Sequence, residues 1–119
     1  MKIRIKGNSL RYRLTKGDMS TLEKKGELEE FTNFAGQTLV YSLKTTKNPV
    51  LSADFIGNKI TLNMPVDMVT EITHTDKVGF QNTYGDLYLL VEKDFTCLDN
   101  VEEDQSDNYP NPHSLNTPN

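Results

Sequence analysis

Apolar and polar residues alternate along much of the chain, which is the pattern of β-strands with one buried face. Ile3 and Ile5 alternate with basic residues, and the alternation resumes after Gly7-Asn8 at residues 10 to 14. The two runs predict a hairpin that turns at Gly7-Asn8. One face of this hairpin is apolar and the other is basic.

A short helix is predicted next. Thr15 and Asp18 have the spacing of a helix N-cap, and Gly26 closes the stretch. Residues 27 to 34 and 37 to 45 then have the pattern of two strands. The first part of the chain is therefore expected to be strand, strand, helix, strand, strand.

The second part of the chain repeats this pattern at an offset near 50 residues. Gly57-Asn58 repeats Gly7-Asn8, and Ile72 repeats Leu22 within a second helix near residues 66 to 74. Val78 repeats Leu28 at the same offset of 50 residues. After a deletion of one residue, Gly85 repeats Gly36 and Lys93 repeats Lys44. A chance match of two similar patterns is the alternative.

The expected fold class is α+β, with about eight mainly antiparallel strands and two short helices. Two similar units, residues 1–45 and 51–94, would close about a pseudo-two-fold axis into a barrel-like or two-layer core, because each is too small to bury its sheet alone. We expect one domain over residues 1–98 and an irregular, acidic, Pro- and Asn-rich tail over residues 99–119. The predicted core comprises Ile3, Ile5, Leu10, Tyr12, Leu14, Leu22, Leu39, Tyr41, Leu43, Phe55, Ile60, Leu62, Ile72 and Leu89.

Charge is distributed unevenly along the 119 residues. Residues 1–25 have a net charge of +6 and residues 94–119 have −6, while the whole chain has −4. The overall balance argues against a general nucleic-acid binder. We expect part of the tail to dock on the basic hairpin face, because the two ends have opposite charge.

Composition and motifs exclude several other classes of protein. The apolar runs are far shorter than the roughly 20 residues of a membrane span, and the charged start does not resemble a secretion signal. Cys97 is the only cysteine, which fits a reducing cytoplasm. The expectation is a cytoplasmic protein that does not enter the membrane.

Both ends of the chain resemble those of a family of small, uncharacterised bacterial proteins with a domain of unknown function. The resemblance rests on residues 1–15 and 91–98, on Glu103-Asp104, and on residues 107–112. It covers the chain nearly end to end and implies a whole-chain bacterial domain. It implies no activity, cofactor or partner.

Five basic side chains are the first candidates for chemistry. Lys2, Arg4, Lys6, Arg11 and Arg13 would project from one face of the hairpin and could bind an anion. The alternative is that they pair with the acidic run at residues 27–30 or with the tail, or face water.

Metal binding and nucleophilic catalysis have weaker support. Glu71 and His74 have a Glu-x-x-His spacing, to which Cys97 and His113 could add ligands, but a single such pair often arises by chance. The acidic run at residues 99–107 lacks the spacing of a calcium loop. Cys97 has no nearby general base in the sequence. We expect no metal, no cofactor and no catalytic residue.

The sequence favours a non-catalytic binding or interaction domain. The alternative is an enzyme that acts on a phosphorylated or otherwise anionic small molecule. In that hypothesis the five basic residues hold the anion, and tail carboxylates such as Asp104 and Asp107 bind a metal or act as a base. An enzyme needs the basic residues to face a pocket with carboxylates opposite, whereas a binding domain does not.

Overall fold

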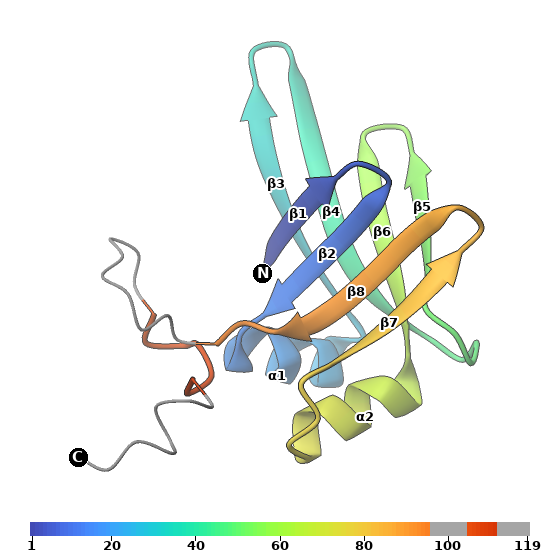
Figure 1. The fold of residues 1–119 in the computed structure, drawn as a ribbon. Coiled ribbons are helices and arrows are strands. Elements are labelled where there is room, and N and C mark those ends of the chain that lie inside the picture. Colours follow the sequence, from blue (N-terminus) through green and yellow to red (C-terminus); the bar gives the residue numbers. More distant parts are fainter. Residues whose placement is uncertain (96–104, 112–119) are drawn as a thin grey trace.

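The computed structural model, which describes residues 1–95 and 105–111, consists of two four-stranded sheets and two helices (Figure 1). The sheets lie face to face, and both helices lie at one end of them. The elements are β1 (Lys2–Lys6), β2 (Ser9–Leu14), α1 (Lys16–Lys25), β3 (Glu27–Phe34), β4 (Gln37–Thr46), β5 (Ser52–Ile56), β6 (Lys59–Pro65), α2 (Val66–His74), β7 (Gly79–Tyr84) and β8 (Leu87–Lys93). The predicted order of eight strands and two helices is confirmed.

Local sequence signals account for the turns and helix ends. Gly7 and Gly57 have φ angles of 54° and 59°, a left-handed conformation that glycine adopts without steric cost. Helix α1 begins with a capping box, in which the Thr15 hydroxyl accepts from the Asp18 amide and the Asp18 carboxylate accepts from the Thr15 amide. Gly26 ends α1 with a φ of 76°.

The two units exchange hairpins to build the sheets. Sheet 1 has the strand order β1-β2-β8-β7, and sheet 2 has the order β3-β4-β6-β5. Each hairpin is antiparallel, whereas β2 pairs with β8 and β4 pairs with β6 in parallel. Each sheet therefore takes two strands from either unit. The pseudo-two-fold arrangement and the two-layer core are confirmed, but the sheets do not close into a barrel.

The repeat is offset differently from the prediction in its second half. Leu14 lies opposite Lys93 in sheet 1, and Met64 lies opposite Thr45 in sheet 2, so Lys93 corresponds to Thr45 and not to Lys44. The reason is that β7 and β8 are shorter than β3 and β4, while the α2–β7 connection is longer than the single residue Gly26. At this offset Val91 corresponds to Leu43. Phe80 lies opposite Val91 and Leu28 lies opposite Leu43, so Phe80, and not Val78, corresponds to Leu28.

Polar contacts between corresponding residues join the two sheets along both edges, as an ion pair at one edge and a hydrogen bond at the other. At one edge the amino group of Met1 lies 3.0 Å from the Glu30 carboxylate of β3. At the other edge the Asn82 amide of β7 donates to the Leu51 carbonyl, which precedes β5, at 2.9 Å. Met1 corresponds to Leu51 and Glu30 to Asn82 in the internal repeat, so the pseudo-symmetry extends to the contacts between the layers.

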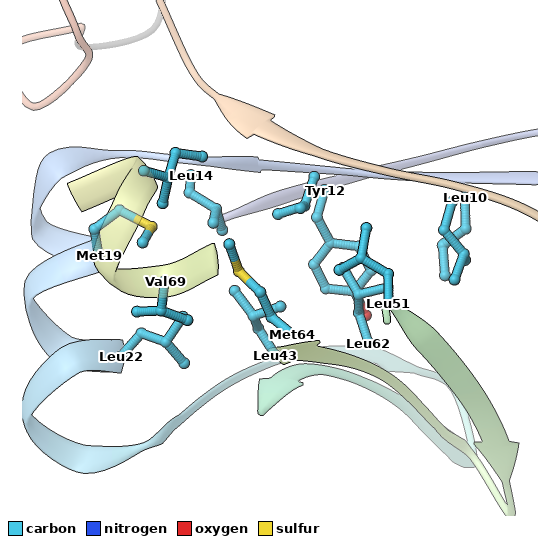
Figure 2. Packing of buried hydrophobic residues seen from close by; sticks show 13 residues of the cluster. Leu10, Tyr12, Leu14, Met19, Leu22, Leu43, Leu51, Leu62, Met64 and Val69 are labelled. Carbon is cyan, nitrogen blue, oxygen red and sulfur yellow. The ribbon is translucent and has the colours of Figure 1, made fainter. Parts of the chain in front are cut away.

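The core fills the space between the sheets and the helices. Met19 and Leu22 of α1 and Val69 of α2 gather with Leu14 and Met64 at the helical end (Figure 2). Side chains from both sheets fill the remaining space. The buried cluster comprises Leu10, Tyr12, Leu14, Met19, Leu22, Leu43, Leu51, Leu62, Met64, Val69, Ile72, Leu89 and Val91.

Two residues of the predicted core are exposed. The side chain of Ile5 is 60% exposed and that of Phe55 is 70% exposed, although their partners Leu10 and Ile60 lie on the inner faces. Both residues are close to a hairpin tip, at the end of the sheets away from the helices (Figure 1). The strand phase was therefore predicted correctly, but no described element covers this end.

None of the helices in the described residues is long and apolar enough to cross a membrane.

Leu62→Ala should lower the free energy of unfolding by about 2 to 5 kcal/mol, because Leu62 is fully buried and its truncation leaves a cavity. Phe55→Ala is the matched control at the corresponding face of β5, and we expect it to cost less than about 1 kcal/mol. Urea denaturation monitored by circular dichroism measures both. Equal losses for the two variants would contradict the described packing.

Candidate functional site

The five predicted basic residues lie on the outer face of sheet 1. The β1–β2 register places Lys2 opposite Arg13 and Arg4 opposite Arg11, while Lys6 lies opposite Ser9. Directly opposite side chains on one face are about 5 Å apart at Cβ, so these cations repel one another unless a carboxylate or an anion lies between them. We call the outer-face residues Lys2, Arg4, Lys6, Arg11 and Arg13 the basic face.

Glu92 of β8 neutralises part of the basic face. Its Oε1 accepts from Nε of Arg11 at 2.6 Å and from Nε of Arg13 at 3.1 Å. The parallel pairing of β2 with β8 places Arg13 directly beside Glu92. Sequence reasoning missed Glu92, although its alternation with the buried Val91 indicates an outward side chain.

The remaining cations differ in their surroundings. Lys2 Nζ lies 3.1 Å from the Asp94 carboxylate, which is almost completely buried. Arg4 and Lys6 are exposed and form no ion pair with residues 1–95 or 105–111. Within the described part of the chain, two of the five cations thus have no ion pair.

Arg4, Lys6 and Arg11 line a shallow depression of about 230 Å³ on the outer face of sheet 1, together with Ser9, Leu10, Tyr88 and Leu90. Tyr88 was not predicted as part of this face, because it comes from the other unit and reaches the hairpin only through the β2–β8 pairing. Its hydroxyl donates to the Gln81 side chain at 2.6 Å. No carboxylate lines this depression within the described residues.

The acidic run at residues 27–30 does not pair with the basic face. Glu29 and Glu27 lie 2.6 and 3.4 Å from Lys59 of their own sheet. The hydrogen bond to Lys59 lowers the pKa of Glu29, and that to Glu29 raises the pKa of Lys59. Of the alternatives considered for the basic residues, pairing with this acidic run is therefore not found, because β3 lies in the opposite sheet.

Glu30 instead lies beside the amino group of Met1, which is also 2.8 Å from Asp18. Burial alone would lower the pKa of this amine, but the two carboxylates together raise it. The first residue is thereby held between β3 and the start of α1.

The described part of the tail binds mainly at the start of α1. The Gly17 amide donates to both oxygens of the Asp107 carboxylate, at 3.1 and 3.2 Å, and the Lys16 amide donates to the Asp107 carbonyl at 3.2 Å. A carboxylate at a helix N-terminus is stabilised by the unsatisfied amides and by the helix dipole. Docking of the acidic end, residues 94–119, on the basic face was predicted. Among the described residues Asp94 pairs with Lys2 of that face and Asn111 shares a depression with Arg11 and Arg13, whereas Asp107 binds beside the face.

Tyr109 anchors the tail to the strand end that follows β8. Its amide donates to the Asp94 carbonyl at 2.9 Å, and its ring meets Phe95 edge-on at 6.1 Å between centroids. The Lys93 ammonium lies 4.9 Å from the centre of the Tyr109 ring and donates to the Thr75 carbonyl at 2.9 Å. These contacts hold the described part of the tail against the end of β8.

The structure does not assemble the other predicted candidates into a site. His74 pairs with Glu23 of α1 at 2.7 Å, while Glu71 lines a separate cavity. Cys97, Asp104 and His113, as well as residues 99–103 of the acidic run, lie outside the described residues. Within residues 1–95 and 105–111 no three His, Cys, Asp or Glu side chains are grouped as metal ligands.

Gly17→Ala should weaken the docking of the tail at the start of α1, because a Cβ at this position would lie 2.7 Å from an Asp107 carboxylate oxygen and would displace that carboxylate from the Gly17 amide. We expect faster hydrogen exchange at the amides of Asn108 and Tyr109. Ser20→Ala, an exposed change in the same helix, is the control and should leave this exchange unaltered. Unchanged protection of Tyr109 in Gly17→Ala would contradict the described contact.

Lys93 should make stability increase with pH in the alkaline range. Burial lowers the pKa of Lys93 below its ordinary value of 10.5, and Asp76 opposes this effect. Between the lowered pKa and 10.5, Lys93 binds more protons in the unfolded chain than in the folded chain. The stability of the wild type relative to Lys93→Met should therefore rise with pH. Urea titrations from neutral pH to pH 10.5 measure the difference. A difference independent of pH would contradict the prediction.

Comparison with known proteins gives one match. Residues 1–113 match the model of a family described as a family of unknown function, DUF7009. No curated protein and no solved structure matches the chain. The resemblance inferred from the two terminal motifs is thus confirmed at the level of a domain of unknown function. Because the match covers nearly the whole sequence, the chain belongs to the DUF7009 family.

Proposed function

We propose that this protein is a non-catalytic binding domain that holds an anionic partner on its basic face. The supporting observation is the depression around Arg4, Lys6 and Arg11, in which two cations have no ion pair within the described residues. Tyr88 and Leu90 add apolar surface beside the cations. A partner with several anionic groups would therefore combine charge neutralisation with some apolar contact.

The alternative of an enzyme for a phosphorylated or anionic small molecule lacks a corresponding observation. Catalysis would require a carboxylate or other base facing the bound anion across a pocket. Glu92 is occupied by Arg11 and Arg13, and Asp107 binds the start of α1. The described carboxylates therefore support a neutralised binding surface better than a reaction centre.

The partner we favour is an acidic protein surface. The depression lies on an open sheet face, which suits contact with another surface more than enclosure of a small molecule. Nucleic acid is less favoured because the net charge of the chain is −4 and Tyr88 is the only aromatic residue among those lining the depression. The single cysteine supports our proposal that the protein works in the cytoplasm.

The double variant Arg4→Gln with Lys6→Gln tests this function. Binding of fluorescent polyglutamate, followed by anisotropy at low salt, should weaken about tenfold, because two cations of the depression are lost. Lys24→Gln with Lys25→Gln removes the same charge from the last turn of α1 and should have little effect. Single-stranded RNA is the comparison probe and should bind more weakly than polyglutamate.

Glu92→Gln provides a change in the opposite direction. Loss of the carboxylate releases Arg11 and Arg13 from their internal partner, so polyglutamate should bind about two- to fivefold more tightly. Equal affinities of the wild type, the Arg4/Lys6 double variant and Glu92→Gln for polyglutamate would refute the proposed function. Equal losses in the basic-face and α1 double variants would show only a nonspecific effect of net charge, which would also refute it.

A further inference from the structure

A second depression, of about 460 Å³, lies at the start of α2. We propose that it binds an extended peptide segment carrying a basic side chain. The depression is formed by the first turn of α2, by the connection from β4 to β5 and by Phe80 of β7. It is separate from the basic face, so this inference does not depend on the proposed function.

The depression is the pseudo-symmetric counterpart of the place where the tail binds. The tail contacts Lys16 and Gly17 at the start of α1 and Asp94 and Phe95 after β8. The internal repeat relates these four residues to Val66, Asp67, Thr46 and Lys47. All four of these counterparts line the depression at α2.

The occupied site shows which kind of ligand this backbone arrangement accepts. The Lys16 amide donates to the Asp107 carbonyl, and the Asp94 carbonyl accepts from the Tyr109 amide. Tyr109 also forms a parallel β-bridge with Phe95. An extended chain is thus held by its main chain between a helix start and a strand end. The amide of Val66 and the carbonyl of Thr46 are the corresponding groups at α2.

The charges differ between the two sites. Gly17 leaves room for the Asp107 carboxylate, since a Cβ there would lie 2.7 Å from one of its oxygens. Asp67 occupies the corresponding position in α2, and Glu71 lies one turn further on the same side of the helix. A carboxylate ligand would therefore meet both a steric clash and two negative charges. A lysine or arginine side chain would find two carboxylates that form no ion pair with the described residues, against the single cation Lys47 among the lining residues.

Apolar surface in the depression can hold a second ligand side chain. Met68 and Phe80 line it and pack against the core cluster, as Tyr109 of the tail does at the α1 site. Val66 is partly exposed at its rim. Pro65 precedes α2 and offers no side-chain acceptor to the first amides of the helix. A ligand carbonyl would satisfy one of these amides.

A peptide titration followed by amide chemical shifts tests the proposal on the full chain. The probe is the acetylated and amidated peptide Lys-Asn-Tyr-Pro-Asn, which is the tail segment 107–111 with lysine in place of its aspartate. We expect shifts at Thr46, Lys47 and residues 66–71. The peptide Asp-Asn-Tyr-Pro-Asn, which retains the tail sequence, should bind the wild type at least about tenfold more weakly.

Three variants make the test specific. Asp67→Asn combined with Glu71→Gln should weaken binding of the lysine peptide about tenfold, whereas Asp76→Asn, which removes one charge outside the depression, should leave it nearly unchanged. Asp67→Gly restores the glycine of the tail-binding site and should favour the aspartate peptide. Shifts confined to other residues, equal binding of the two peptides to the wild type, or no loss in the Asp67/Glu71 double variant would overturn the proposal.

Discussion

The parallel pairing of β2 with β8 and of β4 with β6 is the interaction on which the rest of the structure depends. Neither unit can complete a sheet alone, because an isolated hairpin buries too little apolar surface to be stable in water. Exchange of hairpins gives two four-stranded sheets whose inner faces bury each other. The same pairing brings Tyr88 and Glu92 beside the basic hairpin and places Asp94, which binds the tail, next to Leu14.

The two halves have nearly the same backbone arrangement but different chemistry. Arg4 on the outer face of sheet 1 corresponds to Asp54 on that of sheet 2, and Gly17 corresponds to Asp67. Side chains at such exposed positions can change with little effect on a fold that is held by its core and ladders. The pseudo-symmetry therefore offers two faces and two helix starts, each of which can serve a different ligand.

The carboxylates that stabilise the basic face also determine which of its cations are exposed. Glu92 and Asp94 relieve repulsion among Lys2, Arg11 and Arg13, and they leave Arg4 and Lys6 exposed. Partly exposed ion pairs contribute little to stability individually, so an external anion can compete with them at small cost. The docked tail adds Asp107 at the start of α1, where its charge serves the helix and not the basic face.

The sequence by itself determined the elements, the turn at Gly7, the cap at Thr15 and the phase of most strands, because these depend on local conformational preferences and on a period of two residues. It also located the five basic side chains on one side of a hairpin. Only the tertiary structure decided which hairpins pair, that Phe55 is exposed, and that Asp107 binds α1. These features depend on which residues far apart in the chain come together. Alternation and spacing within a segment do not specify that.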